Sequence, residues 1–149
     1  MKALGGGQKC SAGDTLGKLQ CPHGEYMKSL IDEILAKEKV IRYVAILQNN
    51  TLVSQQRDNI VSASSSDSDK YEELLVNPAM LTLATQRGNI DCGGLRFLLV
   101  RYGNFYQWVS PFKSGHISVC IDANADPMDV INRIESLIGA HQVEVDLVN

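Results

Sequence analysis

The sequence lacks any excess of positive charge: its 14 Lys and Arg residues are outnumbered by 17 Asp and Glu residues, and the net charge is −3. A chain with this balance does not carry the electrostatic footprint of a nucleic-acid-binding protein. No apolar run approaches the roughly 20 residues that a membrane-spanning helix needs. The opening residues, MKALGGG, contain no apolar segment of a signal peptide. We therefore expect no nucleic-acid partner, no membrane span and a cytoplasmic location.

Cysteine is scarce as well, since four cysteines in 149 residues are too few for a disulfide scaffold. Cys10, Cys21 and His23 could supply three zinc ligands, but a structural zinc site normally takes four and includes a close pair of cysteines. Ten residues separate Cys10 from Cys21, and no fourth ligand stands nearby. We expect reduced thiols, no bound metal and no cofactor.

The remaining composition is that of one globular domain, with 44% hydrophobic and 21% charged residues. Residues 1–24 hold six of the twelve glycines and only scattered large apolar residues. We interpret them as a flexible leader, because ordering glycine is costly and few apolar contacts would compensate. The predicted domain covers residues 25–139, and residues 140–149 are predicted to form a C-terminal tail or a short extra strand.

Apolar residues recur at helical or alternating spacing in eight segments of this domain. The predicted helices cover 25–39, a segment from 69 to 87 that Asn77 and Pro78 divide, and a segment that begins at Asp126-Pro127 and ends at Gly139. In the middle segment, Asn77 is expected to cap its second part, and a Ser/Asp-rich loop, 57–70, precedes it. The predicted strands cover 40–48, 51–56, 95–102, 105–111 and 116–122.

Tight turns such as Asn49-Asn50 join consecutive strands, so these strands must be antiparallel. The first and third strands are apolar on both faces, which requires cover on both sides. The sequence therefore predicts an α+β fold in the order α-β-β-α-β-β-β-α, with one five-stranded antiparallel sheet and helices on both faces.

One strand carries a row of chemically interesting residues. His116, Ser118, Cys120 and Asp122 share one face by the period of two. A catalytic triad needs direct contact between nucleophile and base. Side chains two residues apart on one strand stand about 7 Å apart and point in parallel. We therefore predict a mildly polar face packed under a helix, with Cys120 as a small core residue, and no catalytic residue.

The middle helix is apolar all round its axis, which is typical of a helix that is buried on more than one side. A 149-residue monomer has little material left to cover a second side, so this pattern favours a partner chain. The residues concerned are Leu74, Leu75, Val76, Met80, Leu81, Leu83 and Ala84.

In this order of elements the sequence resembles the Roadblock/dynein light-chain family over roughly residues 25–139. The resemblance lies in the helix 26–39 that runs directly into the strand 40–47, in the helix through Leu74–Arg87, and in the three strands before the helix started by Asp126-Pro127. The sequence departs from the compact pattern in its leader, in the long Ser/Asp loop and in Pro78.

The resemblance implies a strand order 2-1-5-4-3, with the first and third helices on one face and the middle helix on the other. It also implies a non-enzymatic homodimer that serves as a scaffold or as a regulator of a small Ras-like GTPase or a motor complex. In such dimers the middle helix and the following strand meet their twofold mates. The expected interface residues are therefore Leu74, Leu75, Met80, Leu81, Leu83, Ala84, Leu95, Phe97 and Leu99.

A second hypothesis remains open on the sequence alone. A small-molecule-binding or catalytic α+β domain could use a pocket near Cys92, His116 and Trp108.

Overall fold

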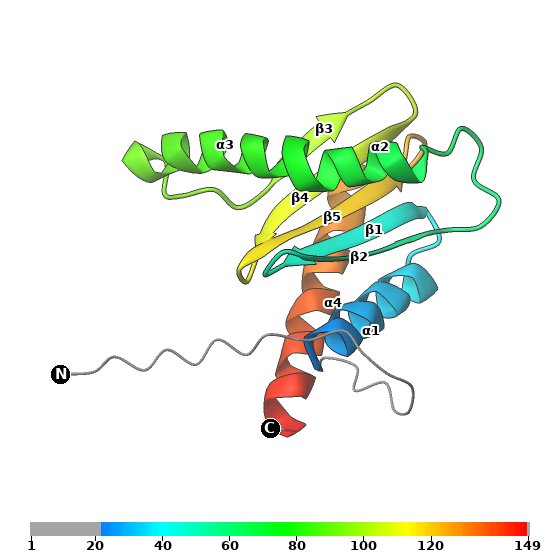
Figure 1. Cartoon of the computed structure of the whole chain (residues 1–149), viewed down its shortest axis with the longest axis horizontal. Helices are drawn as coiled ribbons and strands as arrows, with labels where there is room; N and C mark the ends of the chain where they lie inside the picture. The colour runs from blue at the N-terminus through cyan, green and yellow to red at the C-terminus, as the bar shows by residue number, and fades with distance from the viewer. Residues whose placement is uncertain (1–21, 149) are drawn as a thin grey trace, which may run out of the picture.

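The computed structural model describes residues 22–148 of the chain (Figure 1). Five strands form one antiparallel sheet in the order β2-β1-β5-β4-β3, so the predicted sheet and its strand order are confirmed. Residues 1–21 of the predicted leader, with Cys10 and Cys21, lie outside the described residues, whereas residues 22–24 are helical, so the first helix begins at Pro22 rather than at residue 25. The strands are β1 (Ile41–Gln48), β2 (Thr51–Gln56), β3 (Leu98–Arg101), β4 (Phe105–Phe112) and β5 (Gly115–Asp122).

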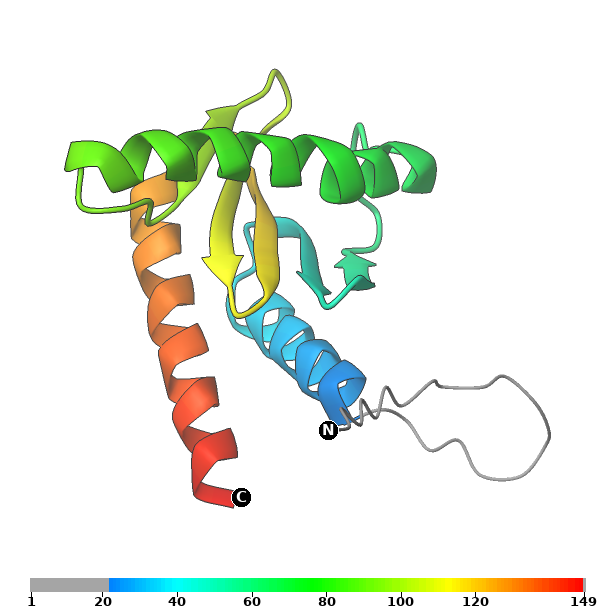
Figure 2. The ribbon, with the colours of Figure 1, turned by 60° about the vertical axis from the view of Figure 1, so that its left-hand side comes forward.

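Helices cover both faces of the sheet, as predicted. The helices α1 (Pro22–Lys37) and α4 (Pro127–Val148) pack on one face. The other face carries one continuous rod (Figures 1 and 2). We call this rod the crossing helix; it consists of α2 (Ser66–Tyr71), the π-helical turn η1 (Glu72–Val76) and α3 (Asn77–Asp91).

The main core lies between the sheet and the pair α1 and α4. Leu30 and Ile34 of α1 and Ile131 of α4 are fully buried there, together with Val44 and Trp108 of the sheet. The tight β1–β2 turn forms as predicted, because Asn49 and Asn50 both adopt a positive φ, of 49° and 64°. Within residues 22–148, no helix is long and apolar enough to cross a membrane.

The crossing helix differs from the prediction at its start and at Asn77. It begins at Ser66 rather than near Asp69, because Ser65 caps it and its Oγ accepts a hydrogen bond of 3.1 Å from the Ser68 N–H. Asn77 does not cap a second segment. Its backbone is helical, and its N–H donates to the Glu72 carbonyl five residues back. The π-turn thus carries the helix into Pro78, which sits in the first turn of α3, where its missing N–H is tolerated.

The predicted helix end at residue 87, just before Gly88, is wrong too, since α3 continues to Asp91. Gly88 serves close packing instead: a Cβ there would lie 3.0 Å from the Gly94 carbonyl carbon. The chain then runs irregularly, and β3 begins at Leu98 rather than at Leu95.

The last helix also extends further than predicted, through residues 140–148, where a tail or strand was expected. Contacts with α1 explain the extension. His141 Nδ1 lies 2.9 Å from Glu33 Oε2, and the Tyr26 hydroxyl donates to Gln142 Oε1 over 3.2 Å. Gly139 therefore lies inside the helix, and a Cβ on it would meet no atom within 4 Å.

Because Gly139 occupies an open position in a helix interior, Gly139→Ala is expected to stabilise the fold by about 1 kcal/mol. The gain arises because alanine has less backbone freedom to lose than glycine. Thermal unfolding monitored by circular dichroism at 222 nm measures it. An unchanged or lower melting temperature would contradict the helical assignment at this position.

Gly115, at the start of β5, should respond in the opposite way. Its Cβ would lie 1.7 Å from the carbonyl oxygen of Leu47 on the paired strand β1. Gly115→Ala must therefore push two central strands apart, and we expect a loss of about 3 kcal/mol in the same assay.

Candidate protein-interaction surface

The crossing helix has its polarity reversed relative to an ordinary surface helix. Its most deeply buried residues are Glu73 and Asn77, both with 0% exposure, and Gly88. Several of its large apolar residues face outward instead, with Leu83 at 68% and Ile90 at 75% exposure. We call the exposed apolar row the outer stripe; it contains Tyr71, Leu74, Leu75, Ala79, Leu83 and Ile90. Exposed apolar rows are typical of interaction surfaces, so this row is the candidate surface.

A buried polar cluster holds the inner side of the helix to the sheet. Glu73 Oε2 lies 2.6 Å from His116 Nε2 and accepts a hydrogen bond of 3.1 Å from Asn77 Nδ2. The hydroxyl of Ser118 donates to Glu73 Oε1. All four side chains are buried, and the carboxylate provides an acceptor that a buried hydroxyl and imidazole require.

The predicted polar face of β5 is therefore confirmed as a face packed under a helix. The buried role of Glu73 was not predicted, because the prediction for this helix was based on its apolar residues. A signal was available, because His116 and Ser118 on a buried strand need a polar partner from the covering element.

The cluster has the geometry of an anchor. In a catalytic triad the serine contacts the histidine, whereas here His116 and Ser118 both contact the carboxylate of Glu73. Exposure of at most 2% leaves no room for a substrate between His116 and Ser118. Within the described part of the chain, no group of three His, Cys, Asp or Glu residues could hold a metal ion.

Cys120 is the next residue on this face, and it is buried. Burial raises the pKa of its thiol, and the negative charge of Glu73 raises it further. The thiol therefore stays protonated at neutral pH and is a poor nucleophile. This agrees with the prediction that Cys120 is a small core residue.

The alternative pocket near Cys92, His116 and Trp108 does not form. Trp108 points into the core between the sheet and α1 and α4, where its ring centroid lies 6.3 Å from that of Phe97. His116 points to the opposite face, under the crossing helix. Cys92 is exposed at the end of α3. Because a β-sheet separates the tryptophan from the histidine, these residues cannot line one site.

The expected interface residues fall into three groups. Leu74, Leu75 and Leu83 belong to the outer stripe. Met80, Leu81, Ala84 and Leu95 are half-buried. Phe97 and Leu99 pack against the main core, on the face away from the crossing helix. Among the nine, the first group is therefore the one the chain leaves open to a partner.

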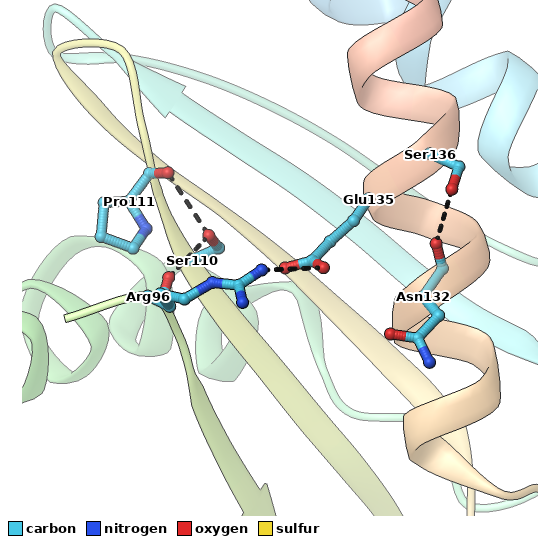
Figure 3. A network of polar contacts seen from close by, with 6 residues as sticks. All are labelled: Arg96, Ser110, Pro111, Asn132, Glu135 and Ser136. Atoms are coloured by element: carbon cyan, nitrogen blue, oxygen red, sulfur yellow. Dashed lines mark hydrogen bonds and ion pairs between the residues drawn. The ribbon is translucent and has the colours of Figure 1, made fainter.

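The edge strand β3 lies next to this surface. It pairs with β4 on one side, and no strand within residues 22–148 pairs with its other edge. Polar contacts fix the segment that leads into it (Figure 3). The Arg96 carbonyl accepts a hydrogen bond of 3.1 Å from Ser110 Oγ. The Arg96 guanidinium lies 3.4 Å from Glu135 Oε2 of α4. The exposed ion pair adds little stability, whereas the Ser110 hydrogen bond connects the chain before β3 to β4.

Comparison with solved structures shows that this is the Roadblock/LC7 fold, so the predicted resemblance is confirmed at the level of the fold. A Roadblock/LC7 domain from Streptomyces avermitilis superposes with a TM-score of 0.57 at 14% identity, covering 82% of this chain and 96% of that one. The gliding protein MglB from Thermus thermophilus gives 0.58 at 14% identity, with 85% and 95% covered. A structure of MglB with a tetrameric arrangement gives 0.58 at 13%, with 79% and 85% covered. No family model and no curated protein matches the sequence.

Proposed function

Starting from a Roadblock/LC7 fold, we propose that this chain is a non-enzymatic homodimeric interaction module, whose dimer docks a small Ras-like GTPase or a larger protein assembly. The observation that carries the proposal is the outer stripe. Its leucines are exposed in the single chain, while Glu73 and Asn77 of the same helix are buried. A second copy of the stripe would cover the apolar side chains and leave the inner cluster intact.

Twofold pairing is the arrangement that fits one self-complementary row. Two crossing helices packed against each other would bury Leu75 and Leu83 of both copies, with the half-buried Met80 and Leu81 at the margins. The unpaired edge of β3 could then meet its mate and extend the sheet across the dimer. The tetrameric arrangement of the structurally similar MglB supports assembly through repeated copies of this fold.

The GTPase part of the proposal rests on the family resemblance. The dimer would act by offering a composite surface that neither copy possesses alone. The role is therefore binding and positioning, and any regulation would come from the shape of the assembled pair.

Light-scattering mass across a concentration series tests the dimer. We expect about twice the chain mass of 16.4 kDa. A mass that stays at 16.4 kDa at high concentration would contradict the dimer and remove the main support for the scaffold role. Binding of purified small Ras-like GTPases, each loaded with GDP or with a non-hydrolysable GTP analogue, then tests the partner.

A further inference from the structure

A pocket of about 270 Å³ lies between the beginning of the crossing helix and the sheet. The helix contributes Asp69, Glu72 and Glu73, and the floor consists of Tyr43 with Cys120. The turn between β3 and β4 forms the opposite wall, with Tyr102 and Phe105 at its two ends. The exposed residues of this turn place the mouth of the pocket at the surface.

Glu73 lies against His116, but Asp69 and Glu72 form no ion pair within residues 22–148. Burial and the neighbouring Glu73 carboxylate raise the pKa of Asp69. Burial also raises the pKa of Glu72, against the lowering effect of its 3.1 Å hydrogen bond from the Tyr102 hydroxyl. Within residues 22–148, no Lys or Arg forms an ion pair with any of the three carboxylates. A cation in the pocket would relieve their mutual repulsion.

Aromatic rings form the walls beside these carboxylates. The ring centroids of Tyr102 and Phe105 lie 5.4 Å apart. The Arg42 guanidinium, in the adjoining hollow, lies 5.8 Å from the centroid of Phe105 and already pairs with that ring. Rings combined with carboxylates are the surroundings in which proteins recognise organic cations.

The Tyr43 hydroxyl is a second and independent sign of a ligand. Tyr43 is only 8% exposed, and within residues 22–148 no group makes a hydrogen bond of normal geometry with its hydroxyl. Burial raises the pKa of this phenol, Glu73 adds to the shift and the nearby Ser54 side chain opposes it, so the group stays neutral. A buried hydroxyl without a partner costs free energy, and a ligand that carries N–H groups would satisfy it.

We propose that this pocket binds a single organic cation, an alkylammonium or guanidinium group. Asp69 and Glu72 supply the opposite charge, Tyr102 and Phe105 supply the ring faces, and the Tyr43 hydroxyl accepts an N–H. The group could belong to a lysine or arginine side chain of a bound protein or to a free amine, since both present the same chemistry. The proposal is independent of the dimer.

Titration of the ¹⁵N-labelled full chain, followed by amide chemical shifts, tests the site. The probes are butylammonium chloride and N-acetyl-lysine methylamide, with sodium chloride at equal ionic strength as the blank. We expect saturable shifts confined to Ser68–Glu72 and Gly103–Phe105. Tighter binding of the capped lysine would support a side chain from a partner protein, and tighter binding of butylammonium would support a free amine.

The double variant Asp69→Asn/Glu72→Gln should weaken both probes at least tenfold. The matched variant Asp58→Asn/Glu144→Gln removes two carboxylates outside the pocket and should bind as the wild type does. Tyr102→Leu, at the partly exposed rim, removes one ring face and the hydroxyl that donates to Glu72 but keeps all pocket carboxylates, and it should also weaken binding. The proposal is overturned if shifts do not saturate, if sodium chloride reproduces them, or if they survive in both pocket variants.

Discussion

Replacing Glu73 with alanine is expected to destabilise the folded chain by about 4 kcal/mol. The substitution removes one carboxylate that three buried groups share: the His116 imidazole, the Ser118 hydroxyl and the Asn77 amide. Each group would then remain between helix and sheet without its partner, and each such loss costs about 1–3 kcal/mol. Urea unfolding followed by Trp108 fluorescence measures the effect as a lower midpoint at unchanged slope.

Glu73→Gln is the matched control for this experiment. A glutamine has the same length, and it can accept the Ser118 hydroxyl through Oε1 and donate to His116 through Nε2, so of the three contacts only the one from the Asn77 amide loses its acceptor. We expect it to lose less than half as much stability as the alanine variant. Glu144→Ala, at an exposed site on α4, should change the free energy of unfolding by less than about 0.5 kcal/mol. Equal and small losses for both Glu73 variants would show that the cluster does not anchor the helix.

Leu83→Glu is expected to split the proposed dimer and to raise its dissociation constant by about a thousandfold or more. Leu83 lies in the middle of the outer stripe, so pairing of two copies would bury two new carboxylates against apolar side chains. Because the side chain is 68% exposed in the single chain, the free energy of unfolding of the monomer should hardly change. Light scattering should report a mass of 16.4 kDa over the range in which the wild type is dimeric.

Leu147→Glu provides the comparison for charge alone. Leu147 is 80% exposed near the end of α4, remote in sequence from the outer stripe, and its substitution should leave the dimer intact. If both variants lower the mass equally, net charge rather than the stripe would govern association. If neither does, the dimer must use another surface.

Long periodic elements and short turns could be predicted from the sequence. The helix after Asp126 begins as expected, and the Met128 N–H bonds the Asp126 carboxylate at 3.0 Å. The two asparagines at 49 and 50 correctly predicted the hairpin turn. The alternation of apolar and polar residues along 116–122 correctly predicted which side chains lie on each face of the sheet. These features depend on neighbours in the sequence, so local rules suffice.

The boundaries and the buried side of the crossing helix could not be predicted correctly, because they depend on contacts with residues that are distant in the sequence. Gly88 looks like a helix end, but it is there because Gly94 passes close by. Pro78 looks like a break, but a π-turn leads the chain into it. Glu73 looks like a solvated charge among leucines, and only the strand beneath the helix explains its burial.

The reversed polarity of the crossing helix has a consequence for how the sequence can drift over evolutionary time. The side chains at positions 73 and 77 belong to one hydrogen-bonded cluster with those at 116 and 118. Substitutions that the fold tolerates at these positions should therefore occur in pairs, one on the helix and one on the strand. In the proposed dimer, the leucines of the outer stripe contact only the same leucines of the second copy. A single mutation therefore changes both sides of the dimer contact at once. Descendants of this chain should therefore keep the inner side through compensating changes, while the outer side is free to acquire a new mate in one step.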